Sequence, residues 1–147
     1  MAGSSKSNEL TVQDIMDVTF ISLDEKTLIA DAAKSMYETE GDTIIVTRTD
    51  PKLGVRIPVG IVTQRDLIYR VISQNKGPFK VNLGSIMSSP LAVIHRSDAI
   101  KKALETMKEK RFSRLPVVTK TGEIVGLITL QMVIQKLPLD KFATSES

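Results

Sequence analysis

Thr63 and Asp66 have the residue types and the spacing that a binding site for a small polar ligand needs. Thr63 lies where an apolar, strand-like run ends and a helical pattern begins, and Thr129 lies at the same point later in the chain. At such a junction a hydroxyl, free backbone N–H groups and the positive end of a helix meet, which favours an anion or a sugar hydroxyl. The same spacing also fits a capping box, in which Thr63 and Asp66 only start the helix. Spacing alone favours the capping box.

The segment around Thr63 and Asp66 is part of a longer repeat. Val59–Leu67 recurs as Val125–Val133, and Asp14–Met16 recurs as Ser85–Met87. Each copy is predicted, from its apolar pattern, to form a short strand, a helix, a strand, a hairpin to a second strand and a final helix. The chain is therefore predicted to be a tandem duplication of the α/β (α+β) class, with two β-α-β-β-α repeats that share a core.

Composition shifts suggest where the repeats begin and end. We place the first repeat at residues 11–75 and the second at residues 83–140, with a linker at 76–82. Residues 1–10 and 141–147 are small and polar, and we predict disordered tails there.

Periodicity predicts the elements that position the two threonines. Apolar residues at helical spacing predict core helices over 28–37 and 99–107, and we expect Ser97 or Asp98 to cap the second of these. β-branched runs predict strands at 43–47 and 115–119, covered on both faces, and a strand is also expected at 91–94. Lys120–Glu123 is predicted to be a tight hairpin turn in which Gly122 takes a positive φ. Residues 48–58 are predicted to form an extended surface hairpin.

Composition excludes several classes of function. The chain has 147 residues, no cysteine and a net charge of +3, so disulfides, thiolate metal sites and cysteine nucleophiles are ruled out. No apolar run approaches the roughly 20 residues that cross a bilayer, and the first residues lack the apolar stretch of a secretory signal. We therefore expect a cytoplasmic protein that does not enter a membrane.

The motif at Gly60–Asp66 resembles the end of the repeat in the cystathionine β-synthase (CBS) domain family. That family's motif is Gly, two apolar residues, Thr or Ser, two variable residues and Asp, and all of these positions match here. The likeness covers about Val12–Pro138 and includes both repeats in order. It implies a pseudo-twofold module, often called a Bateman module, in which two repeats pack through their sheets and leave two clefts for adenine nucleotides.

The resemblance also implies roles for individual residues in one cleft, which we call the first cleft. Asp66 would accept hydrogen bonds from the ribose hydroxyls, as an ionised carboxylate does well, with Thr63 beside it. The adenine would lie against Ser89, Pro90, Leu91 and Ala92. Ser113 and Arg114 match the pair whose basic member faces the phosphate, although the residues alone favour an exposed arginine in a basic run.

The second cleft, around Thr129 and residues 18–21 with Thr19, departs from the family pattern. Met132 stands at the Asp66 position and Thr43 at the Arg114 position, so this cleft lacks both the carboxylate and the positive charge. We therefore predict one competent nucleotide site and a second cleft that is weak, empty or used by another ligand. Arg65 and Gln131, two residues after each threonine, are predicted to reach phosphates in either cleft.

These features predict a regulatory module, a sensor of AMP, ADP or ATP, rather than an enzyme. The sequence has no GxxxxGK loop, no GxGxxG turn and no paired histidines or clustered carboxylates for a metal site. The only histidine, His95, is predicted to end a strand. No cofactor is expected beyond the regulatory nucleotide, with magnesium accompanying ATP.

Two alternatives remain open at this stage. S-adenosylmethionine would suit the same cleft, and the basic stretch at 101–114 would suit nucleic acid. Glutamates interrupt that stretch and no aromatic platform accompanies it, so a solvated helix face is the favoured interpretation. The resemblance further implies a homodimer paired through its helices, acting on a separate partner protein.

Overall fold

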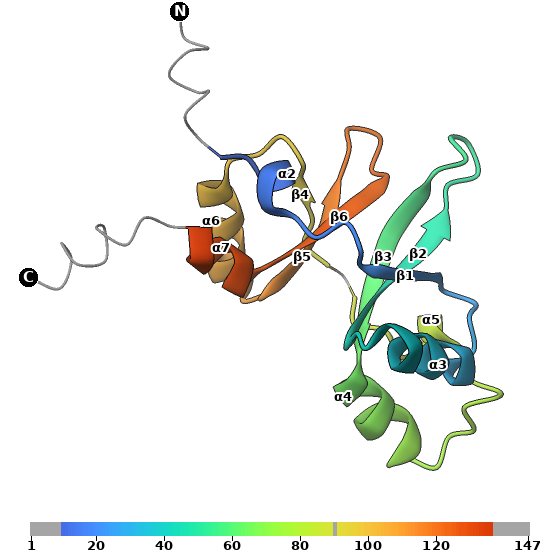
Figure 1. Ribbon diagram of the computed structural model, residues 1–147. Coiled ribbons are helices and arrows are strands. Elements are labelled where there is room, and N and C mark those ends of the chain that lie inside the picture. The colour runs from blue at the N-terminus through green and yellow to red at the C-terminus, as the bar shows by residue number, and fades with distance from the viewer. Residues whose placement is uncertain (1–9, 90, 137–147) are drawn as a thin grey trace, which may run out of the picture.

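The computed structural model describes residues 10–89 and 91–136, and it shows the predicted α/β fold with two β-α-β-β-α repeats. Figure 1 shows two sheets side by side in the middle of the molecule, with the longer helices on their outer sides. The first repeat comprises α2 (Val12–Ile15), β1 (Ile21–Asp24), α3 (Ile29–Thr39), β2 (Thr43–Thr49), β3 (Arg56–Thr63), α4 (Gln64–Asp66) and η1 (Leu67–Ile72). The second comprises α5 (Leu83–Ile86), β4 (Ile94–His95), α6 (Ile100–Lys110), β5 (Arg114–Val118), β6 (Ile124–Thr129) and α7 (Leu130–Lys136).

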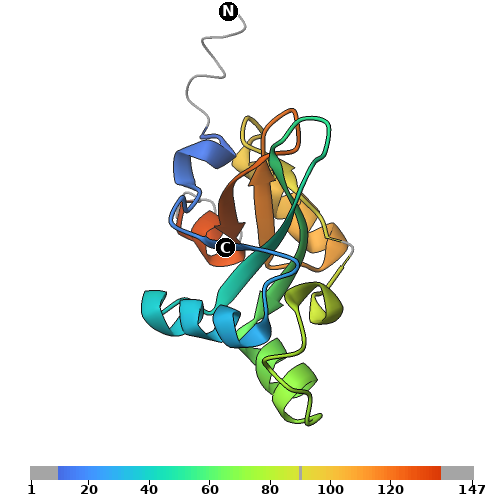
Figure 2. The ribbon, with the colours of Figure 1, turned by 90° about the vertical axis from the view of Figure 1, so that its right-hand side faces the viewer.

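The two sheets have the same mixed topology. In the first, β1 runs parallel to β2, which is antiparallel to β3, and in the second β4, β5 and β6 repeat that arrangement. Strands β3 and β6, one from each repeat, contact each other in the centre of the molecule. Figure 2 shows this central arrangement from the side. Strands β2 and β5 are largely buried, as their β-branched composition predicts. Helices cover the sheet faces that are turned away from the centre of the molecule.

Each repeat has its own apolar core, completed by a short helix from the other repeat. Val12 of α2 packs in the core of the second repeat with Ile94 and Ile128. Leu83 of α5 packs in the core of the first repeat with Ile44. We call this arrangement the helix exchange, and it joins the two repeats through their interiors.

Backbone hydrogen bonds extend the helix exchange. Asp17, just after α2, donates its N–H to the carbonyl of Leu127 in β6 at 2.8 Å and accepts from Leu127 N–H at 3.0 Å. Ser88, just after α5, pairs in the same way with Ile61 in β3, at 3.0 and 3.2 Å. The segment after each short helix therefore lies along the last strand of the other repeat, β6 or β3.

Three local predictions had different outcomes. Gly122 has φ +91° in the hairpin turn, as expected. His95 does end a strand, but that strand is Ile94–His95 and not 91–94, because only these two residues pair with β5. The helix after Thr63 forms but continues as the π-helix η1, in which Ser73 N–H donates to the carbonyl of Ile68.

The predicted side-chain cap of α6 is wrong. The helix begins at Ile100 with Ala99 as its N-cap, while the Asp98 carboxylate accepts from His95 N–H at 3.0 Å. Ile100 N–H instead donates to the backbone carbonyl of Leu10 at 3.4 Å, and Ile29 N–H of α3 donates to Val81 at 2.9 Å. Backbone carbonyls next to the exchanged short helices thus accept from the first N–H groups of α6 and α3, which a capping side chain would otherwise bind.

The long hairpin between β2 and β3 is tied to the loop after β1. Arg48 donates from Nε and a terminal nitrogen to the Glu25 carboxylate at 2.6 and 2.9 Å. These hydrogen bonds hold the pKa of Glu25 below its ordinary value and raise that of Arg48. The first part of the 48–58 extension is therefore anchored to its own repeat.

Candidate functional site

Thr63 and Asp66 form the capping box that their spacing favours. The Asp66 Oδ2 accepts from Thr63 N–H at 2.8 Å and from the Thr63 hydroxyl at 3.1 Å, while Asp66 N–H donates back to Thr63 Oγ1. The other carboxylate oxygen, Oδ1, lies 3.5 Å from Nε of Arg70, which itself donates to the carbonyl of Ile86. These contacts fix the orientation of the carboxylate at the start of α4.

The capping role does not remove Asp66 from the cleft. A carboxylate has about four lone-pair sites, and Oδ1 has only the long contact to Arg70 among the described residues. Thr63 and Asp66 both line a cavity of about 290 Å³, which is the predicted first cleft. Capping and ligand binding are therefore compatible at this position.

Both repeats contribute to the first cleft. Ile61, Thr63 and Asp66 come from β3 and α4, and the other walls come from the segment after α5 and from the loop between α6 and β5. The cavity is lined by Ile61, Thr63, Asp66, Ser88, Leu91, Ala92, Arg111, Phe112, Ser113 and Arg114. It therefore has an aspartate, an apolar wall and two arginines.

Most residues predicted for the first cleft lie there. Thr63, Asp66, Leu91, Ala92, Ser113 and Arg114 all line the cavity. Ser89 is not among the lining residues, although its neighbour Ser88 is, and Pro90 lies outside the described residues.

Arg65 points elsewhere. Its guanidinium stacks on the ring of Tyr69, 4.8 Å from the ring centroid, and it lines neither cleft. Residues one helical turn apart share a face, and Arg65 and Tyr69 are spaced in that way. The predicted reach of Arg65 to a phosphate is therefore not seen.

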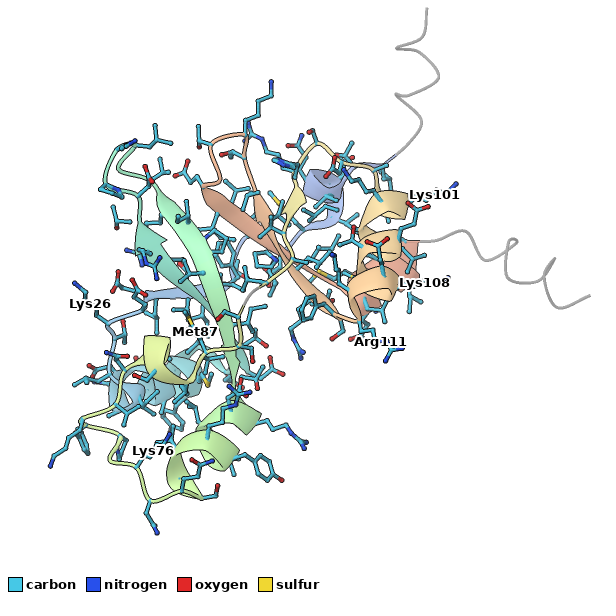
Figure 3. All side chains as sticks on the ribbon, turned by 180° about the vertical axis from the view of Figure 1, so that it is seen from behind. Lys26, Lys76, Met87, Lys101, Lys108 and Arg111 are labelled. Carbon is cyan, nitrogen blue, oxygen red and sulfur yellow. The ribbon has the colours of Figure 1, made fainter. Side chains whose placement is uncertain are left out.

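Arg111 and Phe112 are lining residues that the sequence did not reveal. Arg111 is part of a basic run and was assigned to a solvated helix face, but α6 ends before it and Arg111 takes a left-handed conformation with φ +61°. Phe112 N–H then donates to the carbonyl of Met107 at 3.1 Å, closing the helix end. This turn directs both residues to the first cleft, whereas Lys101 and Lys108 lie along α6 itself (Figure 3). The one sequence signal for such a turn is the short connection between the end of the helix and the start of the next strand.

Arg114 occupies the position that the repeat alignment predicts. It pairs with Thr129 across β5 and β6, as Thr43 pairs with Thr63 across β2 and β3. Within residues 10–89 and 91–136, its guanidinium has no ion pair and no side-chain hydrogen bond. The group is half-buried and available to an anion.

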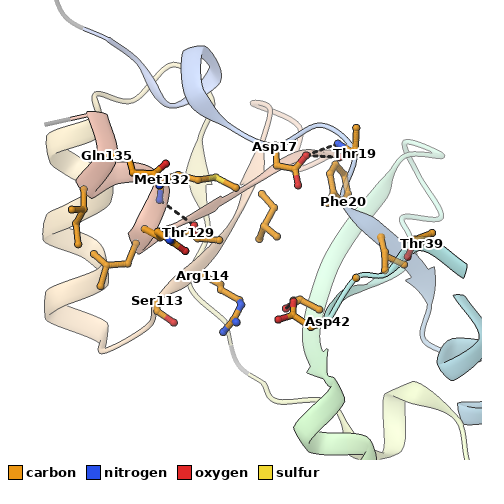
Figure 4. Close-up of a pocket in the computed structure, with 17 residues that line it drawn as sticks. Asp17, Thr19, Phe20, Thr39, Asp42, Ser113, Arg114, Thr129, Met132 and Gln135 are labelled. Atoms are coloured by element: carbon orange, nitrogen blue, oxygen red, sulfur yellow. Dashed lines mark hydrogen bonds between the residues drawn. The ribbon is translucent and has the colours of Figure 1, made fainter. Parts of the chain in front are cut away.

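The second cleft is a larger cavity of about 1030 Å³ on the other side of the central strands. Thr19, Thr129, Gln131 and Met132 line it, as predicted, together with Phe20, Asp17, Asp42, Thr43, Ser113 and Arg114 (Figure 4). The prediction that this cleft lacks a positive charge is wrong, because Arg114, at the start of β5, reaches it as well as the first cleft. Thr129 Oγ1 accepts from Met132 N–H at 3.2 Å, so the threonine caps α7 without a carboxylate to complete the box. Met132 offers no acceptor of comparable strength for a sugar hydroxyl.

The loop between the longer helix and the second strand carries opposite charge in the two repeats. In the second repeat it reads Arg111-Phe112-Ser113-Arg114, and in the first it reads Glu40-Gly41-Asp42-Thr43. Both loops begin with a left-handed residue, Arg111 at φ +61° and Glu40 at φ +56°. The same backbone therefore carries Arg111 and Arg114 in one repeat and Asp42 in the other, and Arg114 lines both clefts.

The described residues form neither a metal site nor a membrane-spanning helix. Residues 10–89 and 91–136 contain no group of three or more His, Asp or Glu side chains placed to hold a metal ion. Over the same residues, none of the helices has the length and apolar character that a membrane crossing requires.

Curated relatives share the repeat pair. The chain is 33% identical over 113 residues to the uncharacterized protein MK0525 of Methanopyrus kandleri, covering 77% of this chain and 55% of the relative. It is 30% identical over 118 residues to a homoserine O-acetyltransferase of Methanohalobium evestigatum, covering 80% of this chain and 22% of that enzyme. The chain thus spans about half the length of the first relative and about a fifth of the second.

Solved structures show the same fold. A conserved CBS domain protein of unknown function from Thermoplasma acidophilum, TA0289, superposes with a TM-score of 0.71 at 26% identity, covering 92% of this chain and 73% of that one. The CBS domain protein PAE2072 of Pyrobaculum aerophilum, solved in complex with AMP, superposes with a TM-score of 0.71 at 22% identity over 94% of this chain and 100% of that one. Residues 12–73 and 83–139 each match the CBS domain. The chain therefore belongs to the CBS domain family and carries two of these domains in tandem.

Proposed function

We propose that the chain is a regulatory module that binds AMP, ADP or ATP in the first cleft, without catalysing a reaction. The observation that carries this proposal is one cavity that joins a carboxylate, an apolar wall and two arginines from both repeats. An adenine nucleotide needs these three kinds of group, for its ribose hydroxyls, its base and its phosphates. The AMP bound to the Pyrobaculum aerophilum protein of the same fold supports the choice of ligand.

Different residues of the first cleft bind the ribose, the base and the phosphates. Oδ1 of Asp66 accepts from ribose hydroxyls, with Thr63 holding the carboxylate in place. Leu91 and Ala92 pack against the base. Arg114 and Arg111 face the phosphates, where a guanidinium makes paired, charge-assisted hydrogen bonds.

Binding would act on the relation between the repeats. The ligand touches β3 and α4 of the first repeat and the loop before β5 of the second, so it stabilises arrangements in which these segments are close. A ligand shifts such an equilibrium only by its difference in affinity between the states. The module would pass this change to a separate partner protein in the cytoplasm, as a homodimer paired through its helices.

Calorimetric titration tests the proposal directly. Protein stripped of copurified ligand is titrated with AMP, ADP, ATP and S-adenosylmethionine, and we expect about one nucleotide per chain. Asp66→Ala should weaken binding about a hundredfold, because two ribose hydrogen bonds to a charged acceptor are lost at about 1.5 kcal/mol each.

Asp14→Ala is the matched control for the loss of the cap. Asp14 makes the same box with Thr11, at 2.7 Å to its N–H and 3.0 Å to its hydroxyl, but lines neither cleft. Its variant should lose similar stability, about 1 kcal/mol, and keep the affinity for nucleotide. Silence across the panel, or a loss below about threefold in Asp66→Ala, contradicts the proposed site. Saturation by S-adenosylmethionine alone would change the ligand class.

A further inference from the structure

Arg114 lies between the two clefts and lines both. It is the first residue of β5, a strand whose neighbour β6 contacts β3 of the other repeat. Figure 4 shows its side chain directed into the second cleft, towards Asp42 on the loop before β2. The residue proposed to bind phosphate in the first cleft thus faces a carboxylate in the second.

Neither charge is neutralised by a closer partner. Across residues 10–89 and 91–136, neither Arg114 nor Asp42 is in any ion pair within 4 Å. The only side-chain hydrogen bond of the Asp42 carboxylate in that part of the chain is from the Thr43 hydroxyl, at 3.0 Å. Asp66 differs, because Thr63 and Arg70 already hold it. Asp42 is therefore the acidic group that competes with a phosphate for Arg114.

We infer that Asp42 is a positioning residue for the nucleotide site, and that the two clefts compete for the single guanidinium of Arg114. This inference rests on the proposed function of the first cleft. Attraction to Asp42 keeps Arg114 towards the second cleft, and nucleotide binding has to draw it away. The affinity of the first cleft is thereby set below the value that its own residues would give.

Because of this competition, a ligand in the second cleft strengthens or weakens nucleotide binding in the first cleft, depending on the charge of that ligand. A positively charged group bound beside Asp42 releases Arg114 and strengthens nucleotide binding. An anion bound there takes Arg114 and weakens nucleotide binding. By linkage, the nucleotide changes the affinity of the second cleft by the same factor.

Asp42→Asn tests the inference, because asparagine keeps the acceptor for Thr43 and removes only the charge. We expect ATP to bind about two- to fivefold more tightly to this variant, the range of a partly exposed charge pair. The gain should be smaller for AMP and absent for adenosine, which has no phosphate. It should shrink in 1 M salt, where the Debye length falls to about 3 Å and the attraction between the two charges is screened.

Asp17→Asn is the matched control. Asp17 lines the same cleft, but its carboxylate accepts from Thr19 N–H at 2.8 Å and from the Thr19 hydroxyl at 2.7 Å, bonds that asparagine can keep. It should leave the affinity for ATP almost unchanged. In an Arg114→Ala background, adding Asp42→Asn should change the weaker ATP affinity by less than about 1.5-fold.

Several results would overturn the inference while leaving the proposed function intact. They are equal ATP affinity of the unsubstituted chain and Asp42→Asn, an equal gain in Asp17→Asn, and a gain that persists without Arg114. If the unsubstituted chain binds none of the nucleotides, the proposed function fails and the inference fails with it.

Discussion

Gly60 and Gly126 explain, at the scale of single residues, why each repeat has glycine at this position of its motif. Gly60 lies in β3 and Gly126 in β6. Each is covered by a methionine that follows the short helix of the other repeat, Met87 over Gly60 and Met16 over Gly126. A Cβ on Gly60 would lie 2.7 Å from Cγ and 2.9 Å from Cβ of Met87. The contact reaches the root of the methionine side chain, so rotation of its far end cannot relieve it. The glycine allows the helix exchange to close.

Gly60→Ala should therefore destabilise the fold. We expect a loss of about 1–3 kcal/mol in the free energy of unfolding, as for other insertions into a packed core, measured by urea denaturation. Gly77→Ala is the control, because its added Cβ would meet nothing nearer than 3.8 Å, at Lys80. Equal stability of the two variants would mean that the methionine moves aside without cost.

The sequence located Asp66 but not the way in which it is used. Its type and spacing predicted a cap and a ligand group as alternatives, whereas the structure shows the cap and places the same carboxylate in the cleft wall. Arg111 and Phe112 were missed, because their direction depends on one left-handed residue at a helix end. Helical periodicity does not encode that change of direction.

The helix exchange dominates at the scale of elements. α2 and α5 have only four residues each, too few to be stable alone, and both are held by packing in the core of the other repeat. The chain beside them also supplies backbone acceptors for the first turns of α3 and α6. These short elements thus acquire their structure from residues of the other repeat, such as Ile94 and Ile128 for Val12 and Ile44 for Leu83.

Truncating the buried side chains of these helices should affect the opposite repeats. Val12→Ala should cost about 2 kcal/mol in the free energy of unfolding and shift the methyl resonances of Ile94 and Ile128. Leu83→Ala should instead shift those of Ile44. Perturbations confined to the variant's own repeat, measured by NMR, would contradict the exchange.

Element prediction succeeded where the signal is local. Apolar spacing predicted α3 and α6, and β-branched runs predicted β2 and β5. The predictions for the cap of α6 and the extent of β4 were wrong, because both depend on chain from outside the element. The exchange itself has no local signature, since a four-residue helix reads the same whichever core it enters.

At the scale of the whole molecule, the two repeats share a backbone plan but differ in charge at the clefts. Arg111 and Arg114 lie in the loop before β5 and Asp42 in the loop before β2, loops of matching geometry, and Arg114 lines both clefts. The helices also carry exposed apolar side chains, among them Tyr37, Ile68 and Ile72. These side chains are where the proposed homodimer would form.

Sedimentation velocity tests the dimer. The unsubstituted chain should sediment as a dimer, and Ile72→Glu should shift it towards the monomer by placing a charge in the interface. Leu53→Glu is the control, since Leu53 is similarly exposed, at 59% against 65%, but lies on the β2–β3 hairpin. A monomeric unsubstituted chain, or equal dissociation of both variants, would contradict pairing through the helices.

The helix exchange bears on how such a chain could have arisen. A polypeptide with only one repeat would send its short helix away and leave its own interior unfilled, so it could complete its fold only by trading helices with an identical copy. Both clefts of that assembly would then be equal by symmetry, and every substitution would appear in both. Once a gene duplication had joined the copies, one repeat could gain arginines and the other an aspartate in the matching loop independently.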